Sequence, residues 1–233
     1  MSQSNSVHSI VDQDTFFEFM RIYATPDSRK RRIFRGQAIA SKPLLPSIAR
    51  FKTSKGEEYN EDDEDLLFRM FKQRAASFLD RSYDDLSIWA LAQHYGLPTR
   101  LMDWSYNPLI AAYFATEHQA NKDEEKEPSA IFIFEDYPEP VIGQHFDIKV
   151  SEIKAFAPAH LDIRVVNQRG LFTVHPYPWK PLQDSRILCV VIAADYRRSL
   201  RKQLNLLGVN ESIIYPGLDG LSKHLKWMKT DAW

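Results

Sequence analysis

The chain has 233 residues, 44% of them hydrophobic, and a formal net charge of -1. That length and apolar content suffice for a packed core in one large domain or two small ones. The charge excludes a generally basic surface, so contact with nucleic acid would need local clusters such as 29–32 or 197–202.

The single cysteine, the N-terminal residues and the lengths of the apolar runs further limit the classes of protein to which the chain can belong. The single cysteine, Cys189, excludes a disulfide framework, and its place in the apolar run 187–193 predicts a buried, inert thiol. Residues 1–14 lack the pattern of a signal peptide, and no run of about eighteen apolar residues occurs. We therefore expect a cytoplasmic protein that does not span a membrane.

The first third of the chain predicts two helices separated by a strand and loops. An amphipathic helix is predicted over 11–23, with Asp12 or Asp14 as its N-cap. The elements predicted after it are a strand at 33–37, a turn-prone apolar patch at 44–48, a flexible loop at 51–60 and a long helix that begins with the acidic run 61–65.

Arg35, near the end of the predicted strand 33–37, is open to two interpretations. It is either an exposed arginine on an edge strand or a cleft residue that binds a phosphate or ribose. In the second case Gly36 would let a ligand approach the backbone, because glycine has no side chain.

The segment 89–115, WALAQHYGLPTRLMDWSYNPLIAAYFA, concentrates polar and aromatic residues at the ends of predicted elements. The pattern predicts a helix that ends at Gly96, a short strand at 99–104 and a new helix with Asn107 as N-cap, running through 110–116. Sites are usually built at such element ends. The residues brought together there are His94, Tyr95, Thr99, Arg100, Asp103, Trp104, Ser105 and Asn107.

The second half is rich in predicted strands. Strands are predicted at 130–135, 150–156, 164–166, 187–193 and 211–215, and helices at 196–207 and 218–228. The segment 167–174 is predicted as a turn or bulge with another β segment. The chain has no internal repeat and no convincing linker. We therefore interpret the N-terminal segment 1–32 and the remainder, 33–228, as one continuous α+β domain.

Several common chemistries lack their signatures. The seven histidines show no metal-ligand spacing, so we expect no metal site. Hydrolase, P-loop and Rossmann interpretations are weakened because the GxSxG, GxxxxGK[ST] and GxGxxG patterns are absent.

Five segments in order resemble the FRG domain family, which is named for its Phe-Arg-Gly motif. They are IFRGQ, LLPSI, HYGLPTRLMDWSYNPLIAAYFA, QRGLFTVHP and IIYPGLDGLSKHL, and together they extend from Ile33 to Leu225.

A more distant resemblance links three features to the signature strands of ADP-ribosyltransferases. Ile33-Phe34-Arg35-Gly36 is similar to their first strand, which ends in Arg or His. Residues 101–105, followed by a helix and the strand 130–134, resemble the second signature, although Asp103 stands near the first serine of its Ser-Thr-Ser triplet. Residues 210–215, NESIIY, resemble the third, which carries a catalytic glutamate.

The second resemblance implies a fold and a site. The fold would have a mixed or antiparallel β core of the ADP-ribosyltransferase type, with flanking helices and a helical insertion. NAD would be the co-substrate, without a metal. Glu211 and Arg35 would be catalytic, because a carboxylate stabilises the oxocarbenium-like state formed when the nicotinamide–ribose bond breaks. The residues implied to bind NAD are Arg35, Gly36, His94, Tyr95, Arg100, Asp103, Trp104, Ser105 and Tyr113. The aromatic that stacks on nicotinamide would be one of Tyr95, Trp104, Tyr113 and Phe172.

Each of these residues also has a structural interpretation. Glu211 could be an exposed acid at a strand start, and Asp103 could cap a turn. Trp104 and Tyr113 are residue types more often found in a core, and Arg100 could pair with Asp103 or Asp85.

We expect a cytoplasmic NAD-dependent ADP-ribosyltransferase of the toxin or anti-phage type, which modifies RNA or DNA as the first candidate and protein as the second. An antitoxin protein would be its partner. The alternatives are an NAD glycohydrolase and a non-catalytic module that binds a nucleotide or a partner protein. A Glu211→Gln variant is expected to lose activity while folding normally.

Overall fold

A mixed β-sheet runs through the middle of the molecule. The computed structural model describes residues 8–25, 30–79, 83–117, 126–142, 147–158 and 170–230. Within these residues eight strands follow the order β1-β8-β4-β2-β3-β7-β6-β5. The strands are β1 Ser9–Ile10, β2 Arg32–Gln37, β3 Leu101–Ser105, β4 Ser129–Glu135, β5 Pro140–Val141, β6 Lys154–Phe156, β7 Gly170–Val174 and β8 Ile187–Ile192. The β1–β8 and β5–β6 pairs are parallel and the others are antiparallel.

The sheet divides between β2 and β3. The strand β2 pairs with β4 from Arg32 to Gln37, and β3 pairs with β7 over its whole length. Within the described strands, β2 and β3 pair only at Phe34 and Ser105. The two halves of the sheet therefore diverge on either side of this single pair.

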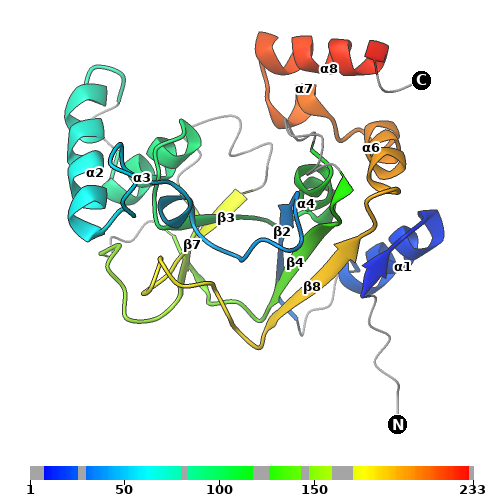
Figure 1. Cartoon of the computed structure of the whole chain (residues 1–233), viewed down its shortest axis with the longest axis horizontal. Helices are drawn as coiled ribbons and strands as arrows, with labels where there is room; N and C mark the ends of the chain where they lie inside the picture. Colours follow the sequence, from blue (N-terminus) through cyan, green and yellow to red (C-terminus); the bar gives the residue numbers. More distant parts are fainter. Residues whose placement is uncertain are drawn as a thin grey trace.

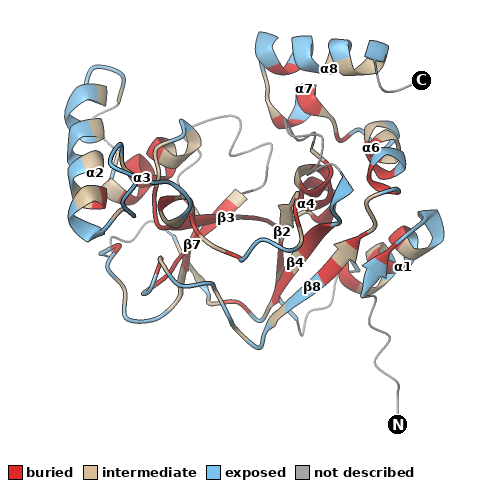
Figure 2. Cartoon of the chain, viewed as in Figure 1, coloured by how far each residue is buried: buried red, intermediate tan, exposed pale blue. Residues whose placement is uncertain are grey.

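Helices cover both halves of the sheet (Figure 1). They are α1 Gln13–Tyr23, the 3-10 helix η1 Ser47–Arg50, α2 Glu61–Ala75, α3 Asp85–His94, α4 Pro108–Ala115, α6 Arg197–Leu206, α7 Glu211–Ile214 and α8 Leu218–Thr230. In Figure 1, α2 and α3 lie beside the β3–β7 half, and α1, α4, α6, α7 and α8 lie on the opposite side of the molecule. Figure 2 shows that α4 is buried along most of its length, whereas α8 is largely exposed.

The largest core cluster lies under α4. Phe34, Ile131 and Val190 from the central strands pack against Ala112 of α4 and Leu200 of α6. A second cluster fills the space between α2, α3 and the β3–β7 half, where the rings of Phe68 and Trp89 stack with centroids 3.8 Å apart. Aromatic stacking of this kind stabilises the contact beyond the area it buries.

Local capping signals explain where several helices begin and end. Asp12 accepts from Thr15 N at the start of α1, and Asn107 accepts from Leu109 N at the start of α4. Gly96 and Gly208, with φ of 91° and 82°, follow the last turns of α3 and α6. The predicted α+β class and most predicted elements are therefore confirmed. The strand predicted at 164–166 lies outside the described residues.

Three predictions about individual segments are wrong. Residues 211–214 form a helical turn, not a strand, because the Asn210 side chain accepts from Ser212 N and caps it. The strand β2 is central, so Arg35 is not on an edge strand. Cys189 is exposed, not buried. Side chains alternate between the two faces of a strand. Val190 is buried in the core, and Cys189, on the opposite face of β8, is exposed.

Within the described residues, no helix is long and apolar enough to cross a bilayer.

Candidate functional site

A cavity of about 390 Å³ opens where β2 and β3 part. Its walls come from β2, β3, the start of β7, the end of α3, α4, η1 and the residue after α7. A cleft of this size is in the range of small-molecule sites.

One side of the cleft is built around Arg35 and Asp103. Arg35 Nη1 donates to the Asp103 carbonyl oxygen at 2.7 Å and lies 3.5 Å from its Oδ2. Gln93 Nε2 donates to Asp103 Oδ1 at 2.7 Å, and Thr99 donates to Gln93. The Arg35 Nε atom is buried and has no hydrogen-bond partner among the described residues. Arg35 therefore keeps hydrogen-bonding capacity inside the cleft.

Arg50 is a second arginine on the cleft wall. Arg50 ends η1, a short helix that is bonded to the segment before β3. Ser47 Oγ donates to Thr99 O at 3.1 Å, and Ile48 N donates to the same oxygen at 3.0 Å. The residue is exposed as a whole. Even so, desolvation and then the charge of Arg35 lower the pKa of its guanidinium. The two arginines thus repel each other across the cleft.

A buried histidine lies behind Arg35. Thr173 Oγ1 accepts from Trp104 Nε1 at 2.8 Å and lies 3.0 Å from His175 Nε2. The histidine tautomer determines which of Thr173 and His175 donates in this bond. Burial, followed by the charge of Arg35, lowers the pKa of His175 to about 4. His175 is therefore neutral near neutral pH.

A second polar group on the cleft wall consists of Glu117 and Tyr215. Tyr215 donates to Glu117 Oε1 at 3.0 Å. Burial and then the charge of Glu117 raise the pKa of Tyr215 above its usual value, so the phenol stays protonated as a donor. Arg197 Nη2 donates to the Glu117 carbonyl oxygen at 3.3 Å and holds this end of α4. The cleft therefore has arginines in one group and a hydrogen-bonded carboxylate in another.

Gly36 explains how α4 can lie so close to β2. A Cβ atom on Gly36 would lie 1.9 Å from Ala111 O and 2.5 Å from Ala115 N. Both are backbone atoms of α4 and cannot move aside as a side chain can. The missing side chain therefore makes room for α4, and the approach of a ligand to Gly36, which also lines the cleft, stays a prediction.

The sequence model of the FRG domain matches residues 30–124. The chain contains an FRG domain. Neither a search of curated proteins nor a search of solved structures gives a match. The match covers β2, η1, α2, α3, β3 and α4, and so includes Arg35, Arg50, Asp103 and Glu117. The resemblance through Leu225 extends further than this match: the segments QRGLFTVHP and IIYPGLDGLSKHL lie beyond it.

The FRG domain brings six of the predicted site residues to the cleft. They are Arg35, Gly36, His94, Asp103, Trp104 and Ser105, and Phe172, a candidate to stack on nicotinamide, lines the cleft as well. The Trp104 indole, however, packs in the core against Phe134, with ring centroids 5.6 Å apart. Ser105 Oγ accepts from Asn107 N at 3.0 Å, which shapes the turn into α4. Tyr95, Arg100, Tyr113 and Glu211 are not on the wall of the cleft.

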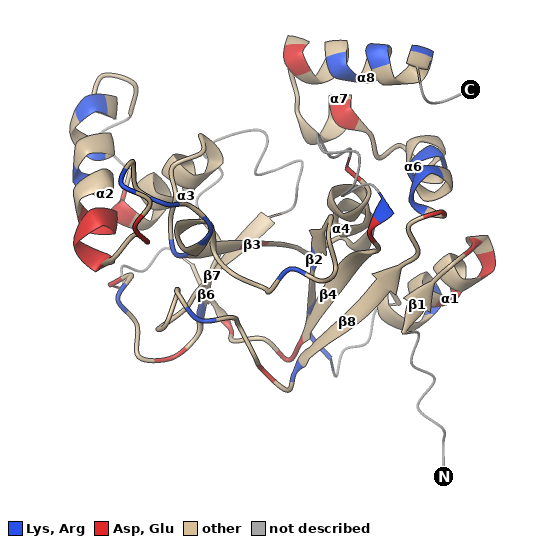
Figure 3. Ribbon diagram, viewed as in Figure 1, with Lys and Arg blue, Asp and Glu red and all other residues tan. Residues whose placement is uncertain are grey.

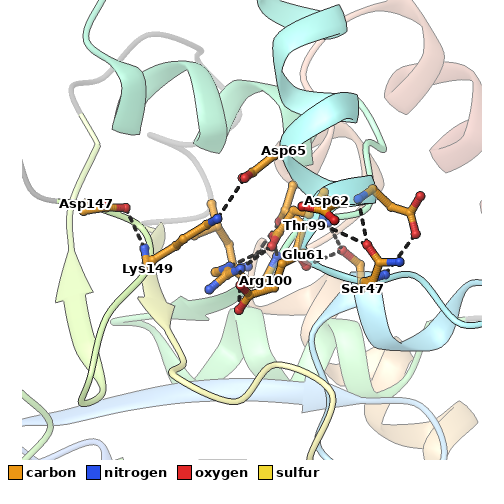
Figure 4. Close-up of polar contacts among 12 residues, drawn as sticks. Ser47, Glu61, Asp62, Asp65, Thr99, Arg100, Asp147 and Lys149 are labelled. Carbon is orange, nitrogen blue, oxygen red and sulfur yellow. Dashed lines mark hydrogen bonds and ion pairs between the residues drawn. The ribbon is translucent and has the colours of Figure 1, made fainter.

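Arg100 is a structural residue of the FRG domain. Its guanidinium Nη2 lies 2.6 Å from Glu64 Oε2, its Nε donates to the same oxygen at 2.8 Å, and both side chains are 1% exposed. Figure 4 shows Arg100 beside Thr99 and Glu61, where the start of α2 meets the segment before β3. Arg100 pairs with neither Asp103 nor Asp85, and its contacts anchor α2.

Glu211 is also held in a buried ion pair. Arg201 Nη2 donates to Glu211 Oε1 at 2.6 Å, and His224 Nδ1 lies 3.1 Å from Oε2. Burial acts to raise the pKa of Glu211, but the charge and hydrogen bond of Arg201 outweigh it and the pKa is lowered. The Arg201 guanidinium also lies 3.5 Å from the ring centroid of Tyr113, which is 0% exposed. Tyr113 therefore belongs to the core, and Tyr95, which is 63% exposed, lies on the surface.

The two basic clusters are largely engaged within the protein. Figure 3 shows the basic residues of the second cluster on α6. Arg32 donates to Glu135 Oε1 at 2.8 Å, and Lys30 lies 3.1 Å from the other oxygen. Arg197 and Arg201 are both under 9% exposed. Arg29 lies outside the described residues. These clusters are therefore poor candidates for an open nucleic-acid surface.

The residues that border the cleft and that sequence reasoning missed include Arg50, Phe114, Glu117 and Tyr215. Phe114 and Glu117 follow from the helix 108–115, whose last turn is directed to the same edge as Arg35. Arg50 could have been found from Ser47-Ile48-Ala49-Arg50, one turn after a proline. No local signal identifies Tyr215. Among the described residues, no group of three or more His, Cys, Asp or Glu side chains could hold a metal ion.

Proposed function

We propose that the protein is an NAD-dependent ADP-ribosyltransferase whose NAD site is the cleft between β2 and β3. The observation that carries the proposal is the charge arrangement of this cleft. Arg35 and Arg50 are in one group, and the Glu117 carboxylate, held by Tyr215, is in another. NAD needs both kinds of group, since it has a pyrophosphate and a ribose that becomes positively charged as the nicotinamide leaves.

The transfer step breaks the bond between ribose C1′ and the nicotinamide nitrogen, and the electron pair stays with nicotinamide. The developing positive charge on the ribose is stabilised by a nearby carboxylate. A nucleophilic acceptor then forms a bond to C1′, and its proton passes to a base. Arginine suits the pyrophosphate because its planar group donates two parallel hydrogen bonds.

Within this proposal the carboxylate is Glu117 and not Glu211. Glu117 lines the cleft, whereas Glu211 does not. Both oxygens of Glu211 are already occupied, one by Arg201 and the other by His224. A carboxylate whose charge is neutralised by a buried arginine does little to stabilise the positive charge that develops on the ribose. Asp103 is the other acidic residue on the cleft wall, but Gln93 and Arg35 hold it.

The order of elements supports the proposal as well. An arginine-bearing strand, β2, is followed in the chain by β3, then by α4 and β4. This is the layout that the resemblance to ADP-ribosyltransferases implied for the first two signatures. The third signature is not matched in the same way, because Glu211 begins a helical turn.

Labelled NAD tests the proposal. The protein is incubated with NAD labelled in the ADP-ribose part, in the presence of RNA, DNA and a protein extract in separate reactions. Label on a macromolecule supports transfer, whereas free ADP-ribose in every reaction supports the glycohydrolase alternative. No turnover with any acceptor would leave the non-catalytic binding module. RNA or DNA is the first acceptor to test and protein the second.

A pair of variants then locates the carboxylate. Glu117→Gln removes the charge while keeping the shape, and is expected to reduce turnover by about a hundredfold or more, a typical effect for one catalytic group. Asp65→Asn, on α2 away from the cleft, is the matched control and is expected to keep wild-type turnover. Unchanged turnover in Glu117→Gln would remove Glu117 from the mechanism.

The biological setting is part of the proposal. A transferase of this kind would act as a toxin or an anti-phage effector, with an antitoxin protein as partner. Poor expression of the wild type that Glu117→Gln relieves would support a toxic activity. Equal expression of both would speak against it.

A further inference from the structure

Arg50 is a charged cleft residue whose individual role the proposed function does not specify. It lies at the end of η1, and its guanidinium interacts electrostatically with Arg35 and Asp103. Arg35 lines the same cavity and has a buried Nε without a partner. Two guanidinium groups that share a cavity repel each other, and this arrangement becomes favourable when an anion lies between them.

We propose that Arg35 and Arg50 together form a binding site for a phosphate or pyrophosphate group at the mouth between β2 and η1. The inference uses the same cleft as the proposed function and names the part of the ligand that this side recognises. It depends on neither transfer nor hydrolysis, since an anion site binds its ligand without turnover.

The position of Arg50 is fixed by contacts far from the cleft. Ser47 Oγ both donates to Thr99 O, at 3.1 Å, and accepts from Thr99 N, at 2.9 Å. Figure 4 shows Ser47 and Thr99 beside the buried Arg100, which α2 holds. Ile48, on the same turn, is 0% exposed. The helix η1 is therefore held by the bonds of Ser47 to Thr99 and by the burial of Ile48. These contacts fix the backbone position of Arg50 at its end.

The surrounding charges favour an anion on this side. On this side of the cleft wall, Asp103 is an acidic side chain that interacts with Arg50 and lies 3.5 Å from Arg35, and Gln93 Nε2 already donates to it. His175, whose pKa the charge of Arg35 helps to lower, is neutral near neutral pH and does not change the charge of this side. Two arginines against one carboxylate leave a net positive charge. Arginine also presents a planar fork that matches phosphate oxygens, which lysine does not.

Binding of inorganic pyrophosphate and of ADP, measured by calorimetry on the full chain without NAD, tests the site. The wild type is expected to bind both, and Arg50→Ala is expected to bind them about tenfold to a hundredfold more weakly, as for loss of a charged hydrogen bond. Arg50→Lys is expected to lie between the two. The control is Arg69→Ala, an exposed arginine on α2, which is expected to bind like the wild type.

The outcomes separate this inference from the proposed function. Equal affinity of wild type and Arg50→Ala, or no measurable binding of either anion to the wild type, overturns the di-arginine site. Pyrophosphate binding that depends on Arg50 in a protein that never turns over NAD keeps the site and removes the transferase. Turnover of NAD with an unchanged KM in Arg50→Ala keeps the transferase and removes the site.

Discussion

Gly36 is a residue at which the neighbouring backbone leaves no room for a side chain. Its Cβ position is occupied by the backbone of α4, at 1.9 Å from Ala111 O. Gly36→Ala would push α4 away from β2 and is expected to lower the free energy of unfolding by about 3 kcal/mol, as for overpacking of a core. Urea denaturation measures this. Gly56→Ala is the comparison, because nothing lies within 4 Å of its Cβ position and its φ of 81° is the only strain. A smaller loss for Gly36→Ala than for Gly56→Ala would contradict the close packing.

Glu211 is expected to act through stability. Glu211→Gln leaves the buried Arg201 without its counter-charge, and breaking a buried pair costs about 3–5 kcal/mol when a partner is removed. Because glutamine still offers an acceptor oxygen, we expect about 2 kcal/mol by denaturation. The loss should be present above the normal carboxyl pKa and vanish as the pH falls through the lowered pKa of Glu211, where the wild type also loses the charge. Glu18→Gln, in an exposed pair with Arg21, is the control. Unchanged stability together with lost turnover would return Glu211 to the mechanism.

At the scale of elements, the sequence predicts what local signals determine. The starts of α1 and α4 follow from Asp12 and Asn107, whose side chains bond backbone groups within three residues. The segment 211–215 was misread because its apolar pattern is also typical of a strand. This single helical turn is determined by the Asn210 cap and by the ion pair of Glu211 with Arg201. An ion pair with another helix leaves no periodic pattern in the sequence.

The helix α2 depends on a contact 36 residues away in sequence. Glu64 accepts from both Arg100 N, at 2.7 Å, and Arg100 Nε. Burial raises the pKa of Glu64 and Arg100 opposes the rise. Glu64→Ala is expected to lower the free energy of unfolding by about 3–5 kcal/mol, because it strands a buried guanidinium. The measurement is thermal and urea denaturation of the full chain.

A control on the same helix isolates burial as the cause. Lys72→Ala removes an exposed pair with Asp85 and should change stability by less than about 1 kcal/mol. The double variant Glu64→Leu with Arg100→Met should recover part of the loss, since two apolar residues leave no unpaired charge. Equal effects of Glu64→Ala and Lys72→Ala would mean that the buried pair does not anchor α2.

At the scale of the whole molecule, the cleft joins segments that no local pattern connects. Arg35 and Asp103 could be placed together from the sequence because both sit on strands with polar residues at their ends. Tyr215 could not, since no local signal marks it and it reaches the cleft only through the packing of distant segments. Arg100 shows the reverse: it lies in a segment rich in site residues but its side chain is directed to α2. The sequence therefore predicts which region of the chain forms the site, but the structure is needed to show which side chains point into it.

His175 couples the stability of the whole molecule to pH. Its pKa in the folded protein is about 4, against 6.5 for a free histidine. Above pH 6.5 the ring is neutral in both states and the stability is fully present. As the pH falls below that value the unfolded chain takes up the proton first, so stability is lost until the pH reaches the folded pKa. Between pH 6.5 and about pH 5 the expected loss is about 2 kcal/mol, before most carboxylates titrate. Urea denaturation across this range measures it, and His175→Gln should show a flatter profile once both proteins are normalised to their values near pH 8. Parallel profiles for the two proteins would mean that His175 is protonated in the folded state and that Arg35 does not have a neutral residue behind it.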